Sequence, residues 1–274
     1  MSRIGERFRQ LAAAGRKALV PYVVAGDPDP AATVPLLHAL VDAGADILEL
    51  GVPFSDPMSE GPVIQRAHER SLARGTRLRA VLDMVREFRC DDADTPLLLM
   101  GYANPVEHMG YEGFADAAAD AGVDGLLTVD IPPEEVARVN RELQRVGMDN
   151  IFLVAPTTPE ARLDLITREA SGFIYYVSLK GVTGAGNLDV EDVSRHLAQI
   201  RGHTGLPVCV GFGIKDAASA AAVAGTADGV VVGSALVDCY ARAVAEGHAP
   251  AAARERVVAL VAEIRRGIDA AVAA

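Results

Sequence analysis

A glutamate, Glu49, stands inside a short apolar run that spans residues 46–52 and leads into the turn-forming segment 53–57. A run this short, apolar and ended by Gly and Pro predicts a strand that is buried on both faces. A carboxylate is rarely buried in such a strand unless it has a function. Because burial favours the neutral acid and raises its pKa, we expect Glu49 to act as a general acid and base near neutral pH.

Two further carboxylates, Asp56 and Glu60, lie in the segment that follows this run. Together with Glu49 they would surround one mouth of the fold, and paired carboxylates suit proton transfer in both directions or the binding of an N–H donor. Their oxygens would also suit a divalent metal. We expect no metal site, because the other predicted strand ends contribute only Asp130 and no histidine. Asp56 and Asp130 could equally be turn or capping residues.

Two glycine-containing segments predict a binding site for a phosphate. Residues 211–214 (Gly-Phe-Gly-Ile) follow the seventh predicted strand, and the pair Gly233 and Ser234 follows the eighth, directly before a helical segment. Glycines let a ligand approach the backbone closely, and free N–H groups at the start of a helix bind an anion. In an eight-stranded barrel the loops after strands seven and eight often form such a site. The alternative is that these glycines only shape tight turns.

A long glycine-rich segment, residues 178–187, follows the sixth predicted strand. Loops of this length in compact domains are often lids that close over a ligand. The hydroxyl of Thr183 within it could form a hydrogen bond with a carboxylate or with the substrate. An irregular connection is the alternative that composition alone allows.

These segments belong to a pattern that repeats along the chain. Eight short runs rich in Val, Ile and Leu alternate with longer segments of helical period, which predicts βα units and a parallel sheet. The runs are 18–24, 46–51, 96–101, 125–129, 150–155, 173–178, 207–211 and 229–233. The helical segments between them are 31–43, 112–121, 133–146, 159–170, 190–201 and 216–224, and the longer connection 61–89 can hold more than one helix.

Eight such units, with no dinucleotide-binding fingerprint after the first, predict a closed barrel. The expected fold class is α/β, a single (β/α)8 TIM barrel domain over residues 1–274, since this fold typically needs about 250 residues. The amphipathic segment 2–11 predicts an extra N-terminal helix that covers the bottom of the barrel, although a transit peptide would share its basic character. Ala-rich helices over 235–246 and 251–273 end the chain. An open doubly wound sheet is the alternative.

Composition argues against several classes of protein. Lys and Arg number 26 against 37 Asp and Glu, a formal net charge of −11, which argues against nucleic acid and anionic membranes as partners. No apolar stretch is long enough to span a bilayer. The three cysteines, Cys90, Cys209 and Cys239, are widely spaced and form no CxxC motif. They indicate reduced thiols in a cytoplasmic protein rather than disulfides or a zinc site.

Six motifs, in order over almost the whole chain, resemble those of the tryptophan synthase α subunit family. They are residues 48–57 (LELGVPFSDP), 61–65 (GPVIQ), 102–105 (YANP), 181–184 (GVTG), 211–214 (GFGI) and 233–235 (GSA). The resemblance implies a (β/α)8 barrel that cleaves indole-3-glycerol phosphate to indole and glyceraldehyde 3-phosphate in tryptophan biosynthesis. It also implies no cofactor on this chain and an α2β2 complex with a β subunit that carries pyridoxal phosphate.

The resemblance further implies a role for each matching residue. Glu49 matches the acid and base that protonates indole C3 and helps to take the proton from the glycerol hydroxyl. Glu60 falls where the family has an aspartate that accepts a hydrogen bond from the indole N–H; Tyr175 lies beside both, and Thr183 orders the second carboxylate from the lid. The matching residues are Gly184, Phe212, Gly213, Gly233 and Ser234 for the phosphate site, Tyr22, Met100, Leu127, Val129 and Leu153 for the indole pocket, and Pro53, Asp56, Asn104, Pro105 and Pro132 for the face toward the β subunit.

Two positions depart from the family pattern. Glu60 is one methylene longer than the family's aspartate, which would displace its carboxylate by about an ångström unless the loop adjusts, and such a displacement can cost a factor of about 100 in rate. The pair Leu179 and Lys180 replaces a segment that carries a basic or small polar residue in many relatives. Three alternatives therefore stay open: a stand-alone lyase that forms indole for a secondary pathway, a weakly active homologue that regulates a β subunit, and a different barrel lyase or isomerase for another sugar phosphate. The run around Glu49 argues against the last.

Overall fold

The strands lie where the sequence predicts them. The structure, a computed structural model, describes residues 2–178, 189–211 and 213–273. Each of the eight expected runs contains a strand, and the fifth run is divided between two. The strands are β1 (Ala18–Val24), β2 (Leu48–Gly51), β3 (Leu97–Gly101), β4 (Gly125–Thr128), β5 (Asp149–Asn150), β6 (Phe152–Val154), β7 (Ile174–Val177), β8 (Val208–Gly211) and β9 (Gly229–Val232).

The sheet closes into a barrel through residues 149–154. The strand order is β5-β4-β3-β2-β1-β9-β8-β7-β6, so β5 pairs with β4 at one edge and β6 pairs with β7 at the other, each in parallel. Between them, Ile151 donates its N–H to the carbonyl of Leu126 at 2.9 Å. One continuous segment is thus the neighbour of both edges, which removes the free edges of an open sheet. The expected barrel is confirmed, because the order follows the chain around the ring without the reversal of a doubly wound sheet.

Alternate residues of each strand pack into two separate hydrophobic layers. In β1, Tyr22 belongs to the layer inside the barrel, whereas Val23 belongs to the layer between the strands and the helices. This alternation follows from the period of two in a strand. Ile47, the residue just before β2, belongs to the interior layer. Glu49 is two residues further on, so its side chain also points into the barrel.

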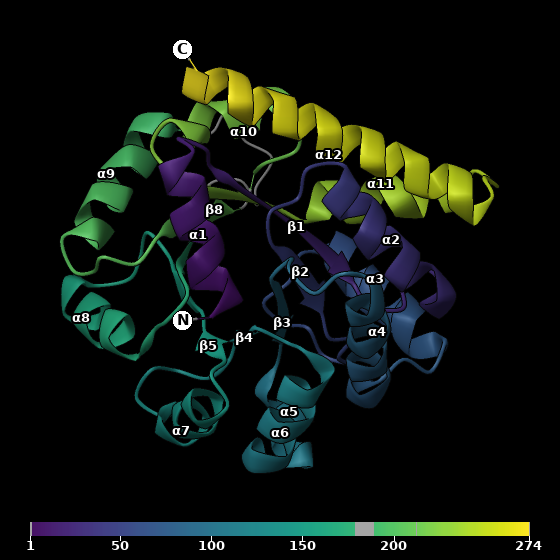
Figure 1. Ribbon diagram of the computed structural model, residues 1–274, viewed down its shortest axis with the longest axis horizontal. Coiled ribbons are helices and arrows are strands. Elements are labelled where there is room, and N and C mark those ends of the chain that lie inside the picture. The colour runs from purple at the N-terminus through teal and green to yellow at the C-terminus, as the bar shows by residue number, and fades with distance from the viewer. Residues whose placement is uncertain (1, 179–188, 212, 274) are drawn as a thin grey trace.

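The helices surround the barrel, as Figure 1 shows. They are α1 (Arg3–Ala13), α2 (Pro30–Asp42), α3 (Pro62–Ala73), α4 (Leu78–Asp91), α5 (Ala103–Met109), α6 (Tyr111–Ala121), α7 (Ala137–Arg145), α8 (Glu160–Glu169), α9 (Val190–Arg201), α10 (Ala217–Ala224), α11 (Ser234–Ala245) and α12 (Pro250–Ala273). The second connection holds two helices, α3 and α4, as its length predicts. The sequence did not indicate α5. Helix α7 begins at Ala137 rather than at residue 133, because a turn in which Glu135 N–H donates to Pro132 O at 2.9 Å comes first.

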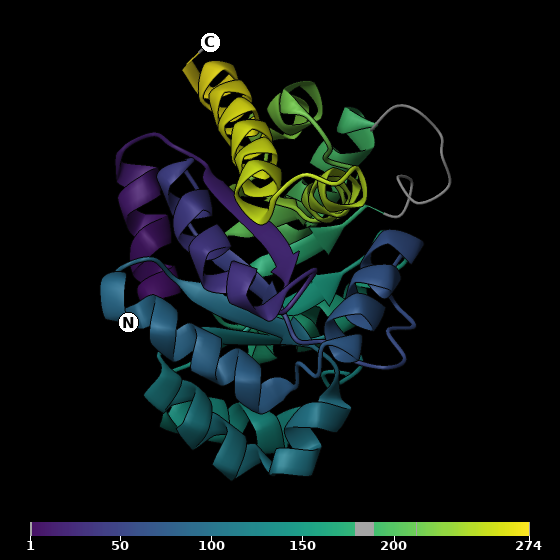
Figure 2. The same ribbon diagram turned by 90° about the vertical axis from the view of Figure 1, so that its right-hand side faces the viewer.

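Helix α1 covers the N-terminal ends of the strands. Ser2 caps it by accepting a hydrogen bond from the N–H of Gly5 at 3.2 Å. Its apolar face, Ile4, Phe8 and Leu11, is buried in the interior layer of the barrel. Figure 2 shows α1 on the side from which the strand arrows start. The expected N-terminal helix at the bottom of the barrel is therefore confirmed.

The last helix, α12, packs along the outside of the barrel against α2, α10 and α11 (Figure 1). Its contact with α10 is close: a Cβ at Gly267 would lie under 3.0 Å from the backbone and side chain of Ala217. Small residues on both helices permit this approach. Over the described ranges, none of the helices combines the length and the apolar character that crossing a membrane would require.

Three aspartates stabilise the bottom of the barrel. Asp46, Asp124 and Asp228 each precede a strand, and each accepts hydrogen bonds from a backbone N–H of the neighbouring strand and from an arginine side chain. The backbone donors are Leu19, Leu97 and Val208 at 2.9, 2.8 and 2.9 Å, and the arginines are Arg265, Arg89 and Arg201 at 3.0, 2.7 and 3.0 Å. Each buried or half-buried carboxylate is therefore compensated, as a structural acid must be.

Candidate active site

Glu49 lies on β2 inside the barrel and is only 1% exposed. Neither of its carboxylate oxygens has a hydrogen-bond partner among the described residues. Burial, and after it the charge of Glu60, raises the pKa of Glu49 to about 8. This is the behaviour expected of an acid–base group at neutral pH, and it contrasts with the compensated aspartates at the other end of the strands.

Glu60 lies in the loop between β2 and α3, close enough to Glu49 for its charge to act on that carboxyl. The backbone of this loop is held on both sides of the residue: Glu60 N–H donates to Pro57 O at 3.0 Å, and Gln65 Nε2 donates to Glu60 O at 2.9 Å. Burial raises the pKa of Glu60 to about 7. The structure thus brings two carboxyl groups together, each able to hold or release a proton near neutral pH.

Two tyrosines complete this polar cluster inside the barrel. Burial raises the pKa of both Tyr22 and Tyr175 well above the ordinary value, and the charges of Glu49 and Glu60 raise it further. Their positions depend on glycines: a Cβ at Gly51 would lie under 3.0 Å from the Tyr22 hydroxyl, and a Cβ at Gly211 under 3.0 Å from that of Tyr175. The glycines that end β2 and β8 therefore make room for two phenolic hydroxyls beside the carboxyl pair.

The residues expected to form an apolar slot line the same interior. Tyr22, Met100 and Leu127 are buried members of the interior layer, and Val129 and Leu153 pack against it while partly buried. Tyr22, Met100, Leu127 and Leu153 lie on β1, β3, β4 and β6, and Val129 directly follows β4. The structure therefore places an apolar wall beside the two carboxyl groups.

The residues expected to bind phosphate lie at the carboxyl ends of the adjacent strands β8 and β9. Gly213 is exposed and has a φ of +78°, which favours glycine, and Gly233 precedes α11. The N–H groups of Ser234 and Ala235, in the first turn of α11, have no intrahelical carbonyl to bond and are available to an anion. Three further expected site residues, Thr183, Gly184 and Phe212, lie outside the described residues.

The five residues expected to face a β subunit follow β2, β3 and β4 at this same end of the barrel; Asn104 and Pro105 lie in the first turn of α5, and the other three lie in loops. Asp56 and Asn104 are exposed, Pro105 and Pro132 are partly buried, and Pro53 is buried. The exposed residues are available to a partner, whereas Pro53 would act through the shape of its loop.

The loops after β2, β3 and β4 are connected by hydrogen bonds. Ser59 N–H donates to the Tyr102 hydroxyl at 3.0 Å, and the rings of Phe54 and Tyr102 stack with their centroids 5.1 Å apart. Asp130 accepts a hydrogen bond from the N–H of Ala103 at 2.7 Å. Asp130, in the loop after β4, therefore satisfies a backbone N–H in the first turn of α5, whose own N-cap residue is Tyr102.

Sequence reasoning missed three residues around this site. Met58 is 76% exposed in the loop that carries Asp56, and Tyr102 connects two loops, as described above. His68 is buried on α3 at 2% exposure, on the same helix face as Ile64. The spacing of four residues between Ile64 and His68 would have indicated that His68 points inward, and its position just beyond the motif 61–65 was the available signal.

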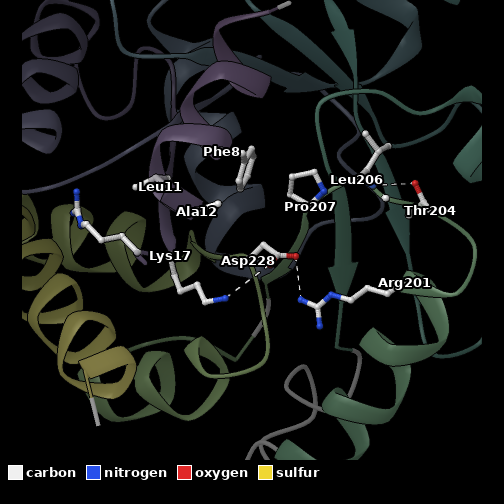
Figure 3. Close-up of a pocket in the computed structure, with 11 residues that line it drawn as sticks. Phe8, Leu11, Ala12, Lys17, Arg201, Thr204, Leu206, Pro207 and Asp228 are labelled. Carbon is white, nitrogen blue, oxygen red and sulfur yellow. Dashed lines mark hydrogen bonds and ion pairs between the residues drawn. The ribbon is translucent and has the colours of Figure 1, made fainter. Parts of the chain in front are cut away.

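A separate cleft lies at the other end of the barrel, beneath α1 (Figure 3). It has a volume of about 370 Å³, and its polar lining includes Arg16, Lys17, Arg201 and Asp228. Asp228 pairs with Lys17 at 3.8 Å and with Arg201 at 3.0 Å, and it also caps β8. Asp228 thus compensates part of the positive charge of this lining, and Arg16 pairs outside it with Asp46 and Asp269, each at 3.9 Å. We place the chemistry at the opposite end, where active sites of (β/α)8 barrels lie.

No group of three His, Cys, Asp or Glu side chains that could hold a metal ion occurs within residues 2–178, 189–211 and 213–273. The two acids at the top of the barrel are thus accompanied by tyrosines and apolar side chains. This set of side chains suits proton transfer to and from an organic substrate.

Comparisons with known proteins agree with this geometry. The family model described as tryptophan synthase alpha chain matches residues 8–268. The tryptophan synthase alpha chain of Thioalkalivibrio sulfidiphilus is 62% identical over 269 residues, which cover 98% of this chain and 100% of that protein. Among solved structures, the chain is similar to tryptophan synthase subunit alpha from Legionella pneumophila, with 46% identity and a TM-score of 0.92 over 98% of this chain and 99% of that one. It is also similar to tryptophan synthase from M. tuberculosis, with 35% identity and a TM-score of 0.86 over 98% of this chain and 99% of that one. The chain therefore belongs to the tryptophan synthase alpha chain family.

Proposed function

We propose that this chain is a carbon–carbon lyase that cleaves indole-3-glycerol phosphate to indole and glyceraldehyde 3-phosphate in tryptophan biosynthesis. The observation that carries the proposal is Glu49, whose carboxyl group has no hydrogen-bond partner among the described residues and lies inside the closed barrel near Glu60. Membership of the alpha chain family supports the same activity.

The reaction is a retro-aldol cleavage that moves one proton within the substrate. Glu49, protonated at neutral pH because its pKa is about 8, gives a proton to indole C3. The resulting indolenine cation is stabilised by Glu60, whose carboxylate accepts a hydrogen bond from the indole N–H. The Glu49 carboxylate then takes the proton of the glycerol hydroxyl as that carbon becomes an aldehyde, and the electrons of the broken C–C bond restore the indole ring. Glu49 thus ends the cycle protonated.

The remaining parts of the site bind the two ends of the substrate. The apolar wall formed by Tyr22, Met100 and Leu127 suits an indole ring, which gains from removal of its surface from water. The N–H groups at the start of α11, beside Gly213, suit the phosphate. Binding at both ends would hold the scissile bond over the carboxyl pair, which is the positioning that such a reaction requires.

We further propose that the face around Asp56, Asn104, Pro105 and Pro132 contacts a β subunit and that this chain carries no cofactor of its own. Family membership supports this partner. The exposed side chain of Met58 on the same face supports it too, because large exposed apolar groups commonly mark contact surfaces. We place the protein in the cytoplasm, in agreement with its three free cysteines.

The test is indole release from indole-3-glycerol phosphate by the purified chain, with and without a tryptophan synthase β subunit. Glu49→Gln should abolish release and leave the affinity for glycerol 3-phosphate nearly unchanged, and Glu263→Gln, at an exposed position on α12, serves as the matched control. Strong stimulation by the β subunit supports the proposal. High activity of the isolated chain would indicate a stand-alone indole-forming lyase, and no activity in either condition would indicate a regulatory homologue.

A further inference from the structure

His68 connects the loop after β2 with the interior of the barrel. Its Nδ1 accepts a hydrogen bond from the N–H of Phe54 at 3.0 Å, and its Nε2 lies 3.4 Å from the hydroxyl oxygen of Tyr22. The side chain is 2% exposed, and burial lowers its pKa to about 4, so the imidazole is neutral at physiological pH.

The bond from Phe54 decides which ring nitrogen of His68 carries the proton. A neutral imidazole has one N–H and one nitrogen that accepts. Since Nδ1 accepts from a backbone N–H, which can only donate, the proton is on Nε2. His68 Nε2–H therefore donates to the Tyr22 oxygen, and the hydroxyl proton of Tyr22 must point elsewhere.

The position of the Tyr22 oxygen limits where that proton can go. Tyr22 and Glu49 are direct partners in the register of β1 and β2. The Tyr22 hydroxyl lies against Gly51, which follows Glu49 by two residues and so lies on the same face of β2. Besides burial, the titratable groups whose charge raises the pKa of Tyr22 are, in decreasing order, Glu60, Glu49, Tyr102 and Tyr175. Only the two carboxyl groups among them become anionic acceptors near neutral pH. Both oxygens of Glu49 lack a partner among the described residues, so the Tyr22 hydroxyl acts on Glu49 without a hydrogen bond to it in this structure.

We infer that His68 is a positioning residue that holds the Tyr22 hydroxyl with its proton directed at the carboxyl pair of Glu49 and Glu60. The inference rests on the proposed function for its catalytic consequence. Tyr22 then has two roles: its ring forms part of the apolar wall, and its hydroxyl stabilises the carboxylate that forms when the proton leaves for the substrate. His68 touches neither the carboxyl pair nor the substrate and acts through Tyr22.

The chain offers a matched pair of variants at position 68. Asn places an amide near the position of Nδ1, so His68→Asn keeps a partner for Phe54 and loses the donor to Tyr22. Gln reaches the position of Nε2, so His68→Gln keeps that donor. Both variants bury one amide, which makes their effects on folding comparable. Tyr22→Phe removes the hydroxyl and keeps the ring.

The experiment is the pH profile of kcat/KM for indole release by these three variants and the parent chain. A hydroxyl proton directed at a carboxylate favours its charged form, so Tyr22→Phe and His68→Asn should each raise the carboxyl pKa in the profile by about one unit and lower kcat about 10-fold. KM should change little. The double variant Tyr22→Phe with His68→Asn should lose no more kcat than Tyr22→Phe alone, and His68→Gln should keep a kcat and a pH profile close to those of the parent. A parent-like profile for Tyr22→Phe would overturn the inference, and so would equal losses in His68→Asn and His68→Gln.

A second measurement separates this inference from the proposed function. The carboxyl carbons of Glu49 and Glu60 can be titrated by ¹³C NMR without substrate. If the parent chain releases no indole with or without a β subunit, the proposed function fails, yet the NMR titration still decides the role of His68. A raised midpoint in Tyr22→Phe and His68→Asn, but not in His68→Gln, supports it, and unchanged midpoints overturn it.

Discussion

Asp46 and Glu49 stand three residues apart, one just before β2 and one within it, and their carboxylates differ in hydrogen bonding, although burial raises the pKa of both. Asp46 accepts hydrogen bonds from Leu19 N–H at 2.9 Å and from Arg265 Nη1 at 3.0 Å. Glu49 has no hydrogen-bond partner for either oxygen among the described residues. Both side chains are buried, at 3% and 1% exposure. The carboxylate of Asp46 is therefore compensated at the bottom of the barrel, whereas that of Glu49 is buried inside it without such compensation among the described residues.

Neutralising these two acids should change stability in opposite directions. Asp46→Asn leaves the buried Arg265 with a weaker partner and should lower the free energy of unfolding by roughly 1–3 kcal/mol at pH 8. Glu49→Gln should raise it. Between the ordinary glutamate pKa of 4.5 and the folded value of about 8, folded Glu49 keeps a proton that the unfolded chain has lost, so stability of the parent falls as pH rises. The gain in the free energy of unfolding of Glu49→Gln over the parent should be small at pH 5 and approach about 4 kcal/mol by pH 8. Denaturant titration at both pH values measures it, and a Glu49→Gln variant that is less stable than the parent at pH 8 would contradict this assignment.

The pH dependence of indole release should reflect the carboxyl pair. Burial, together with the charge of Glu60, places the pKa of Glu49 near 8, and burial places that of Glu60 near 7. The kcat/KM profile should therefore show its transitions between about pH 7 and 8 rather than between pH 4 and 5. The apparent pKa values of these transitions belong to the pair of carboxyl groups and not to either residue alone. Glu60→Gln removes the negative neighbour and should lower the pKa of Glu49. A profile whose only transition lies near pH 4.5 would show that the acids are solvated and not coupled.

Shortening Glu60 should lower activity rather than raise it. The loop places the carboxyl of Glu60 near enough to act on Glu49, Tyr22 and Tyr175, and its backbone is fixed by Gln65. Glu60→Asp withdraws the carboxyl by about one C–C bond, and a displacement of this size can cost about 100-fold in rate. Steady-state kcat with indole-3-glycerol phosphate measures this. Increased turnover would show instead that the longer side chain is a defect in this chain.

A methyl group at position 211 should displace the phenol ring of Tyr175 and so disturb the site. The Cβ of Gly211→Ala would lie under 3.0 Å from the phenol of Tyr175, which is buried and has no room to move freely. We expect a loss of roughly 1–3 kcal/mol in the free energy of unfolding and a lower kcat. Gly225→Ala is the control, since no atom lies within 4 Å of its Cβ and the residue has helical angles. Equal behaviour of the two variants in thermal unfolding and turnover would refute the packing argument.

Local sequence patterns were sufficient for the architecture. The alternation of apolar runs with helical segments located every strand, and an amphipathic segment located α1, because the hydrophobic period of a strand or helix can be read from a few neighbouring residues. The same reasoning identified Glu49, since a carboxylate in a doubly buried strand is conspicuous without any knowledge of its neighbours. It could not show the division of the fifth strand into β5 and β6 or the turn before α7, which depend on which partner each backbone group finds.

The environment of each acid was decided by the tertiary structure. Asp46 and Glu49 look alike in one apolar run, and only the arrival of Arg265 from α12 and of Leu19 from β1 separates a structural carboxylate from a free one. The pairing of Tyr22 with His68 likewise brings together residues from β1 and α3. Charge, hydrogen bonding and burial act through space, so residues far apart in the chain set the pKa of Glu49 and the direction of the Tyr22 hydroxyl.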